Sequence, residues 1–276
     1  MENGKMGRIL VSILLGVCCL SGMGCGQEKQ AEAPETPAVE ITDEMVAQNL
    51  LEFNRGNYRQ GECAAEGHEI LGQEQVEEGT KIYLLAMYGE YGFQDGHFVK
   101  ISGSGVIPTV MVLDETGKCL RLEVPADGSD YEESLKMLFP EEYLKDVSSF
   151  DEEKQKQISE KEREYARNYL QQIGREAEIG DYSDFDWLYF WDVNIPQEAY
   201  EKVNEFAKTE EGFQNYPDWI GSSETLEGDA GRMVYEMNFD AEKNEMVYTK
   251  YSYDSGEIQE QWKFDGTTGE LISHEA

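Results

Sequence analysis

The alternation of apolar and polar residues divides the chain beyond residue 41 into helical and extended segments. Apolar side chains recur at helical spacing in four segments, residues 43–53, 131–139, 151–173 and 197–209. Alternating or aromatic-rich segments typical of strands fall in two groups, 80–93, 97–102, 106–113 and 118–124, then 232–239, 245–253, 257–264 and 270–273. Short turn sequences rich in Asp and Gly separate most of the strands in each group, which favours antiparallel hairpins.

The two groups of strands predict an α+β fold, with two antiparallel β-meanders and intervening helices. We expect a first α+β subdomain over residues 42–147 and a second over residues 148–276. The long charged helix at 151–173 would lie between the two meanders. The pattern leaves open whether the meanders form one sheet or two subdomains.

The first residues have a different pattern. Lys5 and Arg8 precede a mainly apolar run of 12 residues, 9–20, and the small residues before Cys25 follow it. A basic start, a short apolar core and a small-residue site are the order of a secretory signal peptide. Twelve apolar residues are too few to span a bilayer, so the segment predicts export.

The residues Gly24-Cys25-Gly26 resemble the lipobox of bacterial lipoproteins, although Gly22 stands where that motif usually has Leu. The resemblance implies removal of residues 1–24 and lipid modification of Cys25. Fatty acyl chains such as palmitate would then hold the protein on the outer face of the cytoplasmic membrane. An ordinary cleaved signal and free secretion is the alternative. Residues 25–41 have few bulky apolar groups and two prolines, so we expect a flexible tether.

Charge excludes some partners. The chain of 276 residues has 23 Lys and Arg against 57 Asp and Glu, a net charge of −34. Its aromatic content of 11% is too high for a disordered acidic tail, so this charge belongs to a folded protein. Without a cluster of Lys and Arg, such a protein repels nucleic acid and anionic lipid headgroups. We therefore expect neither as a partner, and the membrane is contacted only through the anchor on Cys25.

Two features outside the N-terminal segment suggest cross-links or binding. Cys63 and Cys119 remain after the signal and the anchor, and they form either a disulfide outside the cytoplasm or two buried free thiols. Aromatic residues in the second half form either a ligand groove or part of the hydrophobic core. The groove candidates are Trp187, Tyr189, Trp191, Tyr216 and Trp219.

Carboxylates provide the remaining candidate chemistry. Asp181, Asp184 and Asp186 place three oxygen ligands for calcium in one predicted loop, but the Gly and Glu spacing of an EF-hand is absent. The three histidines are scattered, so no zinc site and no cofactor is expected. A glycosidase pair can arise near Glu90 or near Asp184 and Asp186, with solvated carboxylates as the alternative.

A family resemblance extends over most of residues 62–276 and is carried by short segments, namely 83–93, 102–105, 107–108, 165–170, 173–175, 216–221 and 247–254. They resemble the extracytoplasmic C-terminal region of membrane regulatory metallopeptidases of Gram-positive bacteria, relatives of the beta-lactam sensor and antirepressor proteins. That family has an H-E-x-x-H zinc motif, and its sensor domain has S-x-x-K and K-T-G. None of these motifs occurs here, since Gly72 stands at the second histidine position after His68-Glu69 and Glu210 follows Lys208-Thr209. The resemblance implies an accessory module without peptidase activity or covalent beta-lactam sensing.

These observations favour a membrane-anchored extracytoplasmic lipoprotein. We expect a non-catalytic binding or sensing module for a membrane protein partner or a cell-wall component. A hydrolase that cleaves wall glycan through acidic residues is the alternative, and a scaffolding lipoprotein without a small ligand is a third hypothesis. A carboxyl group in a cleft with a raised pKa would favour the hydrolase.

Overall fold

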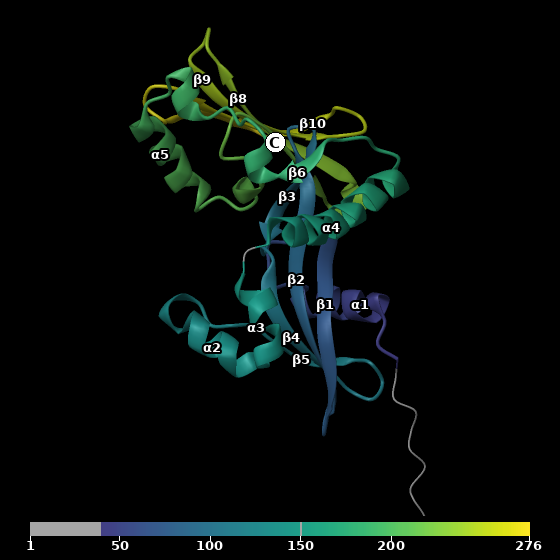
Figure 1. Ribbon diagram of the computed structural model, residues 1–276. Helices are drawn as coiled ribbons and strands as arrows, with labels where there is room; N and C mark the ends of the chain where they lie inside the picture. Colours follow the sequence, from purple (N-terminus) through teal and green to yellow (C-terminus); the bar gives the residue numbers. More distant parts are fainter. Residues whose placement is uncertain (1–39, 150) are drawn as a thin grey trace, which may run out of the picture. The chain divides into compact units, whose positions relative to one another are not determined.

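The computed structural model describes residues 40–149 and 151–276 (Figure 1). The predicted signal peptide, the lipidation candidate Cys25 and residues 25–39 of the predicted tether lie outside the described residues. Within the described part, no helix is both long enough and apolar enough to cross a membrane.

The described strands form one open sheet of 11 strands. They are β1 (Cys63–Val76), β2 (Gly79–Gln94), β3 (His97–Gly103), β4 (Ile107–Leu113), β5 (Cys119–Glu123), β6 (Ile179–Asp181), β7 (Gly221–Leu226), β8 (Arg232–Asp240), β9 (Glu245–Ser252), β10 (Ile258–Asp265) and β11 (Leu271–Glu275). The order is β11-β10-β9-β8-β7-β2-β3-β6, with β1 and β4 also paired to β2, and β5 paired to β4. Only the β3–β6 pair is parallel among these strands. The predicted α+β class with antiparallel strands is confirmed.

The helices are α1 (Asp43–Asn54), α2 (Tyr131–Leu138), α3 (Glu141–Ser148), α4 (Glu152–Ile173) and α5 (Gln197–Ala207). Helix α4 begins where the Asp151 side chain accepts a hydrogen bond from the Lys154 amide, and it ends at Gly174 in the left-handed conformation. The chain resumes a helix directly after Pro140, so α3 adds a helix that the sequence pattern did not predict.

Strand β2 is the centre of the first half (Figure 1). Strand β1 runs antiparallel along nearly its whole length, while β4 pairs with its first half and β3 with its second. Ile82 and Leu84 pack under α1, and Tyr83 and Leu85 pack on the opposite face in a cluster with side chains of α2, α3 and α4. Because both faces are covered, β2 is buried along most of its length.

Helix α4 approaches the sheet closely where β1 has no side chain. A Cβ atom at Gly67 would overlap the carbonyl oxygen of Ile158 on α4. The helix brings Glu162 into the interior, where it is 1% exposed and its Oε1 lies 2.8 Å from Lys100 Nζ. Burial raises the pKa of the Glu162 carboxyl, and the Lys100 charge opposes that change.

The two predicted meanders meet at the end of β2. Gln94 on β2 pairs in register with Ser223 on β7, and the Asp95 amide donates a hydrogen bond to the Ser222 carbonyl at 2.6 Å. The strands of both meanders therefore belong to one sheet, which answers the question that the sequence pattern left open. The described residues also belong to one compact unit.

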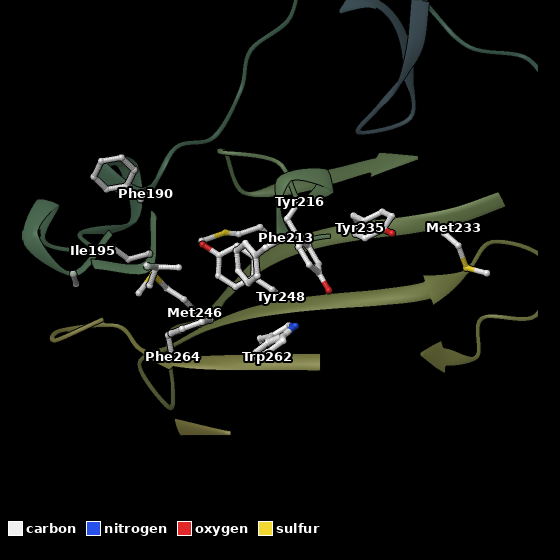
Figure 2. Close-up of a cluster of buried hydrophobic side chains, with 13 residues drawn as sticks. Phe190, Ile195, Phe213, Tyr216, Met233, Tyr235, Met246, Tyr248, Trp262 and Phe264 are labelled. Carbon is white, nitrogen blue, oxygen red and sulfur yellow. The ribbon is translucent and has the colours of Figure 1, made fainter. Parts of the chain in front are cut away.

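The core of the C-terminal half is rich in aromatic side chains (Figure 2). Tyr235 on β8, Tyr248 on β9 and Phe264 on β10 face a layer formed by α5 and the short helical turn at Phe213. These four rings lie in one buried cluster. The other face of the same strands carries polar residues, so this part of the sheet has one packed and one open face.

Candidate functional site

The five candidate groove residues fall into three different environments. Tyr216 is buried in the aromatic core (Figure 2). Trp187 and Trp219 pack against each other with ring centroids 5.1 Å apart, and Trp219 is buried. Tyr189 and Trp191 stack at 4.3 Å, with Trp191 58% exposed. For Tyr216 and Trp219 the structure supports the core interpretation over the ligand groove, because both side chains are buried.

The aspartates proposed for calcium contact an arginine instead. Arg163 Nη2 lies 3.1 Å from Asp181 Oδ2 and 3.3 Å from Asp184 Oδ2, while Asp186 is exposed. Its guanidinium supplies the positive charge that a calcium ion would otherwise provide. Among residues 40–149 and 151–276, no group of three or more His, Cys, Asp or Glu side chains is placed to hold a metal ion. The proposed calcium cluster is therefore not formed.

The two cysteines lie far apart and are free thiols. Cys63 pairs with Tyr91 near one end of β2, whereas Cys119 pairs with Leu113, which in turn pairs with Thr80 near the other end. At about 3.3 Å per residue, this places them about 36 Å apart along β2. A disulfide needs Cα atoms within about 7 Å, so the suggested bridge is wrong for this fold. Burial raises the pKa of the Cys63 thiol to about 12.

Buried carboxylates of the first half serve as internal hydrogen-bond acceptors. Glu66 accepts a hydrogen bond from Tyr165 at 3.1 Å and lies 2.8 Å from His68 Nδ1. Glu90 accepts from the Tyr88 hydroxyl. Both glutamates are almost fully buried. Glu90, a candidate for the glycosidase pair, is thus enclosed by its own fold rather than open to a substrate.

A charge-balanced network of two arginines and two glutamates lies where the meanders join. Arg232 Nη2 donates to Glu62 Oε2 at 2.9 Å, and Arg232 Nη1 donates to Glu224 Oε2 at 3.0 Å. Arg175 Nη2 donates to Glu224 Oε1 at 3.0 Å, and its guanidinium carbon lies 3.5 Å from the ring centre of Phe93. These contacts link the segment before β1, the end of α4, β2, β7 and β8.

A cavity of about 400 Å³ lies beside this network, and we name it the joint pocket. Gln94 and Ser223, the register pair between the halves, form part of its wall and are 5% and 4% exposed. Glu62 and Glu224 of the network also line it, and Arg59 lines it from an exposed position. The pocket thus combines residues from both halves of the sheet.

The polar groups of the joint pocket differ in their availability. Glu62 and Glu224 are held by arginines. Within the described part of the chain, no group forms a hydrogen bond with the side-chain amide of Gln94. No carboxylate there lies within 4.0 Å of the Arg59 guanidinium. A free amide can donate and accept, and a free guanidinium can bind a carboxylate in a bidentate manner. This arrangement can bind a small polar ligand with an anionic group.

A second cavity of about 520 Å³ covers the open face of β8, β9 and β10, and we name it the open-face hollow. Glu236 lines it, and burial together with the nearby Asp95 charge raises the pKa of this carboxyl. Asp240 lines the same hollow but lies four residues further along β8. At about 3.3 Å per residue, the Cα atoms of Glu236 and Asp240 are about 13 Å apart. That exceeds the roughly 5–9.5 Å between the carboxyl groups of glycosidases.

Comparison of the chain with protein-family models, with curated proteins and with solved structures finds no match in any of the three.

Sequence reasoning did not single out the residues of the joint pocket. Arg59, Gln94 and Ser223 are ordinary polar residues without a shared motif, and more than 100 positions separate the first two from the third. The one available signal was the Asp95-Gly96 turn, which predicts the end of β2 where the pocket forms. Only the pairing of β2 with β7 shows that these side chains meet.

Proposed function

We propose that this protein is a membrane-anchored extracytoplasmic lipoprotein whose folded part is a non-catalytic binding or sensing module. The joint pocket is its ligand site in this proposal. The observation that carries it is a polar cavity of about 400 Å³ walled by residues from both halves of the sheet. Small-molecule sites of this size occur preferentially at junctions between structural units. The signal sequence and the predicted anchor at Cys25 support the location outside the cytoplasm.

The chemistry of the pocket favours binding over proton transfer. Its two carboxylates are neutralised by Arg232, and Glu224 also by Arg175. The groups left to contact a ligand are amides, hydroxyls and the Arg59 guanidinium. We therefore expect a small polar component of the cell wall, such as a short peptide with a free carboxylate. Such a ligand satisfies the guanidinium and the Gln94 amide together.

A ligand in this pocket would contact the end of β2 and the start of β7 at once. It would add contacts between two halves that are already joined by the Gln94–Ser223 register pair, the Asp95–Ser222 hydrogen bond and the arginine network. Binding at such a place favours the arrangement that the ligand contacts best, which is the physical basis of sensing. The anchor would keep this response close to a partner in the membrane.

The test is calorimetric titration of the detergent-solubilised mature protein with purified peptide fragments of cell wall. We expect saturable binding by the wild type and at least a tenfold weaker Kd for Arg59→Ala. Arg55→Ala is the matched control, because Arg55 is also exposed but does not line the pocket. Failure of every fragment to bind, or equal binding by both variants, would contradict the proposed site.

A hydrolase acting on wall glycan is the second candidate, and it rests on Glu236 alone, because Asp240 lies too far along β8 to form a glycosidase pair with it. This carboxyl lines the open-face hollow and has a raised pKa, as a general acid requires. If this candidate is correct, Glu236→Gln abolishes digestion of purified wall without lowering the unfolding temperature. Glu245→Gln in the same hollow is the control. The absence of any digestion by the wild-type protein would remove this candidate.

A further inference from the structure

We propose that the groove between α1 and β5 binds an extended, basic segment of a partner protein. We name it the α1–β5 groove and define it by Glu44, Glu52 and Phe53 on α1 with Leu122 and Val124 on the strand side. This surface is separate from the joint pocket and does not depend on the ligand proposed there. Three independent observations determine the chemistry of the occupant.

The first observation is an apolar cavity of about 220 Å³ at the C-terminal end of α1. Phe53 and Val124 line it while remaining 42% and 44% exposed, and Ile107 adds a third exposed apolar side chain. Leu122 extends the same wall on β5. An apolar cavity bordered by exposed apolar side chains fits large apolar side chains of a partner.

The second observation is the free edge of β5. This strand pairs with β4 on one side only. Asn49 on α1 covers the start of the edge, because its side chain accepts a hydrogen bond from the Cys119 amide and donates one to the Gly117 carbonyl. Beyond that point no described strand pairs with the outer edge. A peptide that adds as a further strand satisfies such an edge and places alternate side chains beside Leu122 and Val124.

The third observation is charge. A second cavity of about 400 Å³ lies at the other end of the contact between α1 and β5, and Glu44 and Glu52 line it together with one cation, Lys118. Neither glutamate forms an ion pair with a described residue. The chain as a whole has a net charge of −34, which repels a second copy and attracts a cationic segment. The occupant is therefore an extended segment with alternating apolar and basic residues.

The experiment uses the detergent-solubilised mature protein and three labelled ten-residue peptides at physiological salt. One peptide alternates Val and Lys, one alternates Val and Glu, and the third is the Val-Lys peptide with N-methyl groups along one backbone edge. Fluorescence anisotropy should show binding of the Val-Lys peptide that is at least tenfold tighter than that of the other two. Equal affinity for the N-methylated peptide would overturn strand addition.

Two variants separate the groove from general charge attraction. Glu52→Lys should weaken binding of the Val-Lys peptide at least tenfold, whereas Glu133→Lys on exposed α2 makes the same charge change elsewhere and should leave it nearly unchanged. Equal loss in both would reduce the effect to net charge and overturn the proposal. Concentration-dependent dimers that Val124→Glu abolishes would instead make a second copy the occupant. Calorimetry with wall fragments should be unaffected in Glu52→Lys, so failure here is distinguishable from failure of the joint pocket.

Discussion

Arg232 and Glu62 are 170 positions apart in the chain and form a bidentate ion pair in the interior. The side chains are only 11% and 6% exposed, so water contributes little to their solvation. Glu224 and Arg175 extend the pair into a network with equal numbers of positive and negative groups. Because the network joins β8 to the segment before β1, it fixes the position of the C-terminal meander against the first half.

Removing one member of this network should be costly. Arg232→Ala leaves Glu62 without its cation, and the loss of one partner from a buried pair costs about 3–5 kcal/mol of unfolding free energy. Urea unfolding of the protein, monitored by tryptophan fluorescence, measures the change. Arg167→Ala removes an exposed pair with Glu160 and should change the stability by less than about 1 kcal/mol. Similar losses in the two variants would show that the network is not a major contributor.

The contact between α4 and β1 should tolerate no side chain at Gly67. Gly67→Ala places a Cβ against the Ile158 carbonyl, and overpacking of this kind costs about 1–3 kcal/mol. Gly105→Ala is the control, because a Cβ there has no neighbour within 4 Å. The difference between their urea midpoints measures the effect. An unchanged midpoint in Gly67→Ala would mean that α4 can shift away from β1 at no cost.

The buried Glu162 should make stability fall as pH rises above the ordinary glutamate range. Burial raises the pKa of this carboxyl in the folded state above its ordinary value of 4.5. Between the two values the folded state holds a proton that the unfolded state has lost, so raising the pH through this window favours unfolding. Glu162→Gln lacks this titration. Its stability relative to the wild type should therefore increase from pH 4 upward, and a decrease in urea titrations across pH 4–8 would contradict the assignment.

Cys63 and Cys119 should behave as two free, protected thiols. Burial raises the pKa of Cys63 to about 12 and also raises that of Cys119. The reactive thiolate is therefore rare at pH 8. Mass spectrometry after iodoacetamide treatment should show little labelling of the native protein and two adducts after unfolding without reductant. If the unfolded protein gains adducts only after reduction, the result would support a disulfide between the two cysteines instead.

The predicted anchor at Cys25 has a direct test in cells. Cys25→Ser removes the thiol to which the diacylglycerol would be attached in the lipoprotein interpretation. We expect the wild type in the membrane fraction and the variant in the soluble or secreted fraction. Cross-linking in intact cells should recover a membrane partner with the wild type alone. Equal membrane retention of both forms would contradict lipidation at this residue.

Local sequence patterns were sufficient to predict the structure wherever neighbouring residues determine it. The Asp95-Gly96 turn has positive φ at both residues, as a tight hairpin requires, and Gly174 ends α4 in the left-handed conformation. The sequence pattern predicts no bounds for strand β1, because its sequence is rich in Gly and Glu and has few β-branched residues. Its structure comes from thirteen register pairs with β2, which override its weak strand propensity.

The sequence by itself determined the α+β class and most helices and hairpins, while the export signal and the anchor at Cys25 stay predictions. These depend on the spacing of apolar residues and on turn chemistry, which act over a few positions. Only the tertiary structure decided that Cys63 and Cys119 lie far apart, that Tyr216 belongs to the core and that Gln94 meets Ser223 in the joint pocket. Such contacts depend on how distant segments pack around β2, and the energies that select them are properties of the whole fold.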